Sequence, residues 1–189
     1  MDTFKKPGIL VLLMLFMAAT RTHHFETLMH LPDASLAVFL LAGFFISNPA
    51  AFGILFLEAV LIDYLAITHF GVSDFCVTPA YWFLIPTYGV LWFAGRSYSR
   101  ICQFTLSSLG VFTFMSLASV SAAFLISNGA FYAFSGRFPE MSLADYAARV
   151  SGYFLPYLDS ALVYLVPAAL IYAAFAIREH VHFTSHAGQ

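Results

Sequence analysis

Charged side chains are scarce in this sequence. Asp, Glu, Lys and Arg together make up 10% of its 189 residues, whereas they make up roughly 25% of an ordinary soluble domain. Hydrophobic residues account for 61% of the chain, and the mean hydropathy is +0.83. This composition excludes a soluble fold and predicts that the chain lies in a lipid bilayer along its whole length.

Basic residues and cysteines are also few, and both shortages exclude classes of function. Eight Lys and Arg residues against ten Asp and Glu residues give a net charge of −2, so there is no positive surplus to bind nucleic acid. Two cysteines cannot build a disulfide framework, and the sequence has no Cys-x-x-Cys pair for zinc. It also has no Gly-x-x-x-x-Gly-Lys loop, so it does not hydrolyse ATP by that route.

Six apolar segments separated by turn residues predict an all-α membrane protein. The segments do not alternate apolar and polar residues, as the strands of a transmembrane barrel would. We therefore expect six transmembrane helices in one domain, residues 1–189, without internal repeats or a long linker. The segments cover residues 7–19, 34–47, 50–67, 79–94, 101–127 and 154–177.

Capping patterns mark where three of the helices begin. Asn48-Pro49 and Thr78-Pro79 each place a capping side chain before a proline that suits the first helical position. Ser142 followed three residues later by Asp145 forms a capping box. At that point we expect an amphipathic turn that leads into the last helix.

The distribution of basic residues orients the six helices. With six spans, Lys and Arg are in a modest majority on the side of the two termini, so both termini are expected in the cytoplasm. Lys5-Lys6 before a short apolar run also resembles a signal peptide, but Met17 is too large for the cleavage site. The basic residues on the side of the termini are Lys5, Lys6, Arg96, Arg100 and Arg178; those on the outward side are Arg21, Arg137 and Arg149.

Cys76 lies in the third connection, two residues before the predicted cap Thr78. The positive end of the helix that follows favours a thiolate, whereas the neighbouring Asp74 opposes it. Alternatively, Cys76 is a small buried hydrophobic residue. Cys102 begins the fifth predicted helix on the other side of the membrane, so it is expected to be too far away for a disulfide and to serve in packing.

Two carboxylates fall inside the third predicted helix, where each is costly unless it is protonated, paired or hydrated. Asp63 lies near the outward end and is the better candidate for contact with a ligand. Glu58 lies five residues earlier, about 140° away around the helix, and is expected to form a hydrogen bond across the bundle.

Three further residues near the outward end each have a functional and a structural interpretation. His24 could bind a metal, accept a proton or cap the first helix. Arg149 could reach a ligand or form an ion pair with Asp145, four residues earlier. Tyr81 could face a ligand or belong to the belt of aromatic residues at the membrane surface.

Six helices, the first connection "THHFETLMHLPD" and the third connection "SDFCVTPAYWF" together resemble the BtuM type of bacterial cobalamin transporter. That family is similar to the S-components of energy-coupling-factor transporters. The resemblance implies a six-helix S-component fold in the bacterial inner membrane. It also implies an outward-facing pocket for cobalamin or a related corrinoid such as cobinamide.

The resemblance further implies that Cys76 coordinates the cobalt and that His24 is a second axial or orienting group. Asp63, Tyr81 and Arg149 would then be pocket residues. Cys76 could also labilise the cyanide of cyanocobalamin on the opposite face of the cobalt.

In one respect the sequence departs from the pattern of S-components. These proteins carry an Ala-x-x-x-Ala patch on the first helix that docks to a coupling subunit, but Met14 and Thr22 stand four residues before and after Ala18. The departure puts an energising module in doubt and favours a protein that acts alone or with another partner.

A membrane thiol enzyme is the alternative function. In such a hydrolase or acyltransferase, Cys76 would be the nucleophile, His24 or His69 the base, and Asp63 the residue that orients the base. The sequence offers no Gly-x-Ser-x-Gly elbow that would supply an oxyanion site.

Overall fold

The computed structural model describes residues 5–21, 31–103 and 106–187, and within these ranges the regular structure is entirely helical. The all-α prediction is therefore confirmed for the described residues. Their helices are α1 (Lys5–Arg21), α2 (Ser35–Phe45), α3 (Pro49–Phe70), α4 (Leu84–Ile101), α5 (Leu106–Phe134), α6 (Leu143–Ser151) and α7 (Phe154–Ala187), with the short 3₁₀ helices η1 (Asp74–Cys76) and η2 (Pro79–Phe83).

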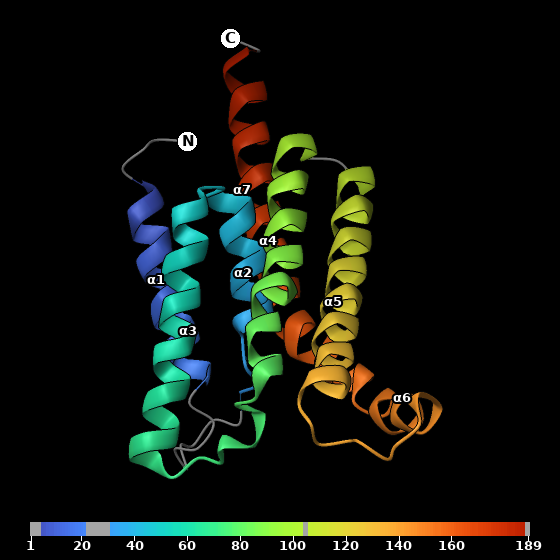
Figure 1. Ribbon diagram of the computed structural model, residues 1–189. Coiled ribbons are helices and arrows are strands. Elements are labelled where there is room, and N and C mark those ends of the chain that lie inside the picture. The colour runs from blue at the N-terminus through green and yellow to red at the C-terminus, as the bar shows by residue number, and fades with distance from the viewer. Residues whose placement is uncertain (1–4, 22–30, 104–105, 188–189) are drawn as a thin grey trace.

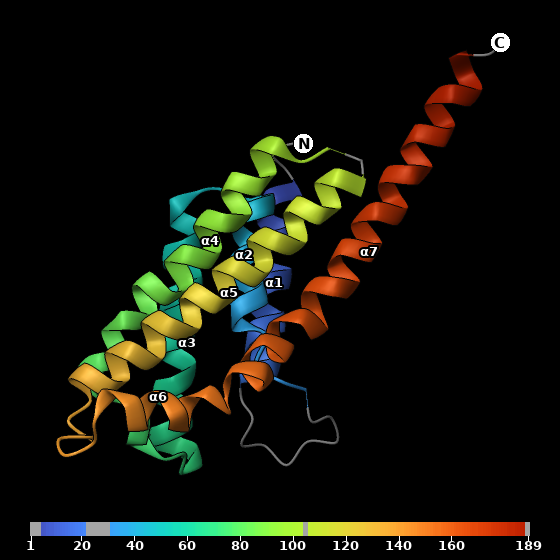
Figure 2. The ribbon, with the colours of Figure 1, turned by 90° about the vertical axis from the view of Figure 1, so that its right-hand side faces the viewer.

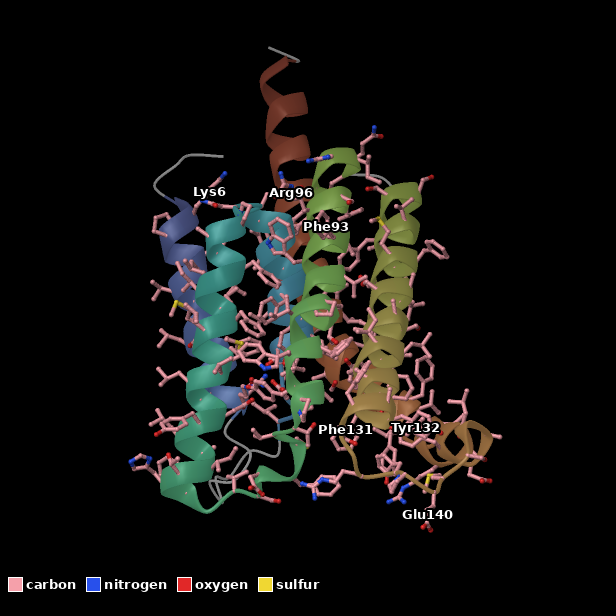
Figure 3. All side chains as sticks on the ribbon, viewed as in Figure 1. Lys6, Phe93, Arg96, Phe131, Tyr132 and Glu140 are labelled. Atoms are coloured by element: carbon pink, nitrogen blue, oxygen red, sulfur yellow. The ribbon has the colours of Figure 1, made fainter. Side chains whose placement is uncertain are left out.

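Six of the helices run alternately up and down along a common direction. Figure 1 shows α1, α2, α3, α4, α5 and α7 in this arrangement, with both chain ends on the same side. The short helix α6 lies across the opposite end, and α7 leaves the bundle at an angle (Figure 2). Lys6 and Arg96 lie toward the end with the termini, whereas Glu140 lies at the other end (Figure 3).

A helix begins after each of the three predicted caps, although Thr78 caps the 3₁₀ helix η2 and α4 follows it only from Leu84. The side chains of Asn48, Thr78 and Ser142 each accept a hydrogen bond from a backbone N–H in the first turn. Ser142 begins a separate helix, α6, rather than a first turn of the last helix. Cys102 does not begin the fifth helix, because its extended backbone ends α4 and α5 starts only at Leu106.

Three of the described helices are long and apolar enough to cross a bilayer: Pro49–Phe70, Ser107–Phe134 and Phe154–Ile171. Their large side chains point outward, as for Leu57, Phe114 and Leu155, which are 69%, 72% and 71% exposed. Outward-facing apolar side chains of this size on every spanning helix are typical of contact with lipid rather than water. These helices give the protein its transmembrane character.

The core of the bundle is built around α2, whose residues are mostly buried. Phe39 of α2 is fully buried, as are Met17 of α1 and Leu55 of α3. Helices α2 and α4 cross at two glycines. A Cβ atom on Gly43 would lie 2.0 Å from the carbonyl oxygen of Trp92, and a Cβ on Gly95 would lie 1.9 Å from that of Leu40. Only glycine allows the two backbones to come this close.

Candidate functional site

A cavity of about 240 Å³ lies near the end of the bundle opposite the termini. Its walls come from the C-terminal parts of α1, α3 and α5 and from the segment that joins α3 to α4, because all of these meet at that end. Phe131, on the wall formed by α5, marks its position in Figure 3. The lining residues are Arg21, Asp63, Cys76, Ala80, Tyr81, Phe83, Leu84, Ser127 and Phe131.

Three of the residues singled out in the sequence line this one cavity: Cys76, Asp63 and Tyr81. Asp63 lies on α3, Cys76 lies at the end of η1, and Tyr81 lies in η2. The chain turns back between α3 and α4 at this end, which is why residues 13 and 18 positions after Asp63 return to it.

Arg21, at the end of α1, is the centre of the polar contacts around the cavity, and its side chain is only 9% exposed. Its Nε and Nη2 atoms donate to the two carboxylate oxygens of Asp63, each over 2.7 Å. Its Nη1 atom donates to Ser35 Oγ and Tyr88 Oη, each over 2.8 Å, and lies 3.5 Å from Asp33 Oδ2. A planar guanidinium is suited to this two-pronged pairing with a carboxylate. We call these five residues and Tyr81 the Arg21 network.

Asp63 belongs to this network through both of its oxygens. Tyr81 donates its hydroxyl proton to Asp63 Oδ2 over 2.7 Å, the same oxygen that accepts from Arg21 Nη2. Asp63 therefore holds Tyr81 against the cavity wall and is itself fixed by Arg21. The sequence predicts that Asp63 contacts a ligand. Such a contact would have to form while these three hydrogen bonds remain in place.

Cys76 ends the turn η1, which is capped by the side chain of Ser73. Burial and the negative charge of Asp63 raise the pKa of the Cys76 thiol above its ordinary value, while the positive charge of Arg137 acts to lower it. The sequence suggested Asp74 as the opposing carboxylate, but the carboxylate that raises the pKa is that of Asp63. At neutral pH the thiol is therefore mainly protonated until a metal or a base removes the proton.

The rate at which iodoacetamide alkylates Cys76 is expected to rise with pH around a midpoint above that of a free cysteine, because the thiolate is the reacting form. Asp63→Asn should move this midpoint to lower pH, and Arg137→Gln should move it to higher pH. The measurement is mass spectrometry of Cys76 in a Cys102→Ser background. Equal midpoints in all three proteins would contradict the assignment of these two charges.

Arg149 does not line the cavity. It is exposed on α6, with its guanidinium carbon 5.9 Å from the centre of the Phe138 ring. The alternative, an ion pair with Asp145, is not formed either; one oxygen of that carboxylate, Oδ2, accepts the hydroxyl proton of Ser142 over 2.6 Å.

Aromatic side chains connect the cysteine turn with α5 and with the segment that joins α5 to α6. The ring of Phe75 lies 5.8 Å from that of Phe131, which lies 5.8 Å from that of Phe138. Arg137 also lies over Phe75, with its guanidinium carbon 4.5 Å from the ring centre. These contacts pack the turn that carries Cys76 against the C-terminal end of α5.

The histidines do not complete a catalytic set in the described part of the chain. His24 lies outside the described residues. His69 is exposed at the end of α3, where its Nδ1 atom is 2.7 Å from Thr68 Oγ1, and it does not line the cavity. Of the residues expected for a thiol enzyme, the structure brings together Cys76 and Asp63.

Glu58 differs from its expectation. Its Oε2 atom is buried, and no residue in the described ranges offers it a hydrogen bond. The predicted bond across the bundle is therefore not made by this oxygen.

Sequence reasoning missed six of the residues that line the cavity: Arg21, Ala80, Phe83, Leu84, Ser127 and Phe131. Arg21 had a usable signal, because a lone arginine at the end of an apolar helix needs an acidic partner, and Asp63 is an acid near the same side of the membrane. The two phenylalanines had none, since the sequence holds 22 of them.

No protein-family model matches the chain, and no curated protein matches it. The cavity itself is therefore the basis for a functional proposal.

Proposed function

We propose that this protein takes up cobalamin or a related corrinoid across the bacterial inner membrane. In this proposal it has six membrane-spanning helices with both termini in the cytoplasm, and Cys76 Sγ binds the cobalt. The observation that carries the proposal is the position of Cys76 on an aromatic-lined cavity, at the end of the bundle away from Lys6 and Arg96. Positive charge marks the cytoplasmic side, so that cavity faces outward.

The metal-ligating side chains of the described residues favour a metal that is already coordinated by another molecule. Among the described residues, no group of three or more His, Cys, Asp or Glu side chains could hold a bare ion. A cobalt ion in a corrin ring already has four nitrogen ligands and needs one axial donor from the protein, which a soft thiolate can supply. Cys76 is a donor of this kind.

The other walls of the cavity suit the rest of such a ligand. Phe83 and Phe131 offer apolar surface to the ring, and Tyr81 and Ser127 offer hydroxyl groups to its amide rim. At about 240 Å³ the cavity is smaller than the ~300–1,000 Å³ of pockets that enclose a ligand. A corrinoid would thus be held by one face, with its remaining bulk beyond the cavity.

The proposal is tested by adding cyanocobalamin or cobinamide to the purified protein in detergent and recording visible spectra. We expect a spectral change and release of cyanide in the wild-type protein and in Cys102→Ser, and neither in Cys76→Ser or Cys76→Ala. Cys102→Ser is the matched control, because Cys102 follows α4 at the other end of the bundle.

Two outcomes would contradict the proposal. Ligand conversion that is unchanged in Cys76→Ala would remove the thiol from binding. Absence of corrinoid binding, together with acylation of Cys76 by an activated ester, would instead favour the thiol enzyme. A cobalamin-dependent bacterial strain without its own importer gives the cellular readout, because its growth on limiting vitamin should depend on Cys76.

A further inference from the structure

Glu58 is a carboxylate in the middle of the membrane-spanning helix α3. It lies nine residues after Pro49 and twelve before Phe70, which places it about 14 Å and about 18 Å from the two ends of the helix. Leu55, three positions earlier, and the adjacent Ala59 are fully buried. The Oε2 atom of Glu58 is buried as well, and no described residue offers it a hydrogen bond.

The helices that pack against α3 are α1, α2 and α4, and none of their described residues forms an ion pair with Glu58. Helix α2 has no titratable residue, and α1 has none between Lys6 and Arg21. Arg21 is paired with Asp63. The titratable residues of α4 are Tyr88, which is bonded to Arg21, Arg96, which lies over Trp92, Tyr98, which contacts Ser108, and the exposed Arg100; the others of α3 are Asp63, Tyr64 and His69.

A carboxylate without a countercharge at this depth is costly when it is ionised. Protonation removes the charge, and burying a neutral polar group costs far less than burying an ion. Glu58 is therefore expected to hold a proton while the bundle is in the conformation described here.

The other acidic residues of the described spanning helices are in different situations. Asp63 lies near the outward end of α3 and is neutralised by Arg21. Asp159 is exposed, five residues after the start of α7 at the same end. Among the acidic residues of these helices, Glu58 combines a position at mid-membrane with a buried oxygen that lacks a partner.

We propose that Glu58 is a proton-binding site through which the proton gradient drives uptake. Its carboxylate takes one proton from the outward side, stays buried as a neutral acid, and releases that proton when the bundle opens to the cytoplasm. The O–H bond of the carboxyl group is the one bond that forms and breaks. This inference rests on the proposed uptake function.

Two features of the chain support a coupling role for this proton. Glu58 lies on the same helix as Asp63, which lines the cavity, and about 7.5 Å farther from the outward end. A movement of α3 that opens the cavity inward would therefore also move Glu58. The sequence has no Gly-x-x-x-x-Gly-Lys loop for ATP hydrolysis, so the described chain offers a proton site where it offers no nucleotide site of that kind.

The first test needs no corrinoid. Dicyclohexylcarbodiimide is an apolar reagent that modifies protonated carboxyl groups inside membranes, and mass spectrometry locates its adduct. We expect an adduct on Glu58 of the wild-type protein that decreases as the pH is raised. Asp159→Asn is the matched control, because it removes another carboxylate from a spanning helix and should leave the labelling of Glu58 unchanged. Absence of the adduct, or labelling that does not depend on pH, would overturn the proposal.

The second test measures cobinamide uptake into liposomes that contain the purified protein, with the membrane potential held at zero. With the interior about one pH unit more alkaline than the exterior, the wild-type protein and Asp159→Asn should accumulate up to about tenfold more cobinamide than without the gradient, for one proton per corrinoid. Glu58→Gln, which resembles a permanently protonated Glu58, should bind cobinamide as the wild-type protein does and show no effect of the gradient.

The outcomes separate this inference from the proposed function. Wild-type uptake that is the same with and without the gradient, or a full gradient effect in Glu58→Gln, would overturn the coupling and leave corrinoid uptake intact. Cys76→Ser should lose uptake and keep the adduct on Glu58. Absence of uptake by the wild-type protein in both conditions would contradict the uptake function and the coupling with it, while the labelling would still decide whether Glu58 holds a proton.

Discussion

Replacement of Gly95 by alanine is expected to lower the free energy of unfolding by about 3 kcal/mol, the upper part of the range for an overpacked core. The new Cβ atom would lie 1.9 Å from the carbonyl oxygen of Leu40 and 2.9 Å from the backbone nitrogen of Phe44. Backbone atoms cannot rotate away as the tip of a side chain can. Helices α2 and α4 would have to separate, and the packing of Phe39 and Leu91 around their crossing would be disturbed.

Gly89→Ala is the matched control, because it makes the same chemical change on the same helix. A Cβ atom on Gly89 meets no atom within 4 Å, and alanine has the higher helix propensity. We therefore expect Gly89→Ala to be as stable as the wild-type protein or slightly more stable. Thermal unfolding of the detergent-solubilised proteins checks this, and equal melting temperatures for the two variants would show that the close crossing is wrong.

Asp63→Leu is expected to lower the free energy of unfolding by about 3–5 kcal/mol, the usual effect of removing one partner of a buried ion pair. Arg21 would keep its charge in a site where its side chain is 9% exposed, and Tyr81 would lose the acceptor of its hydroxyl proton. The double variant Arg21→Met/Asp63→Leu should recover most of the loss, because the buried guanidinium is gone and the carboxylate that then lacks its cation, Asp33, is 38% exposed to solvent.

The measurement is a double-mutant cycle on unfolding in detergent, with Glu140→Gln as the control. Glu140 is an exposed carboxylate at the same end of the molecule (Figure 3), and its neutralisation should change stability by less than about 0.5 kcal/mol. A double variant that is less stable than both single variants would contradict the pairing as the source of the effect.

Several features of this protein followed from residues close together in the sequence. The apolar segments predicted the helices, and Asn48, Thr78 and Ser142 each cap the helix that follows them. Asp63 and Cys76 lie near one end of the bundle because both are close to the turn between α3 and α4. Such features depend on the hydropathy of a segment or on hydrogen bonds within one turn, so they can be recognised without knowing the fold.

Two other predictions from local sequence patterns, the ion pair of Arg149 and the start of the fifth helix, differ from the structure. The spacing of Asp145 and Arg149 allowed an ion pair between them, but Arg149 lies over Phe138, and Asp145 is hydrogen-bonded to Ser142. The apolar run from Ile101 onward predicts the start of one helix. In the structure Ile101 is the last residue of α4, and the extended backbone of Cys102 separates it from α5. In both cases the pattern of neighbouring residues allowed the predicted feature without requiring it.

The sequence by itself determined that the chain is helical and apolar enough for a membrane, and that few side chains can carry chemistry. Only the tertiary structure decided how those side chains are used. Arg21 meets Asp63 across 42 positions of sequence and Tyr88 across 67, and the crossing of α2 and α4 fixes the packing around them. The physical reason is that hydropathy and capping act within a few residues, whereas an ion pair between helices forms only where their packing brings the two charges together.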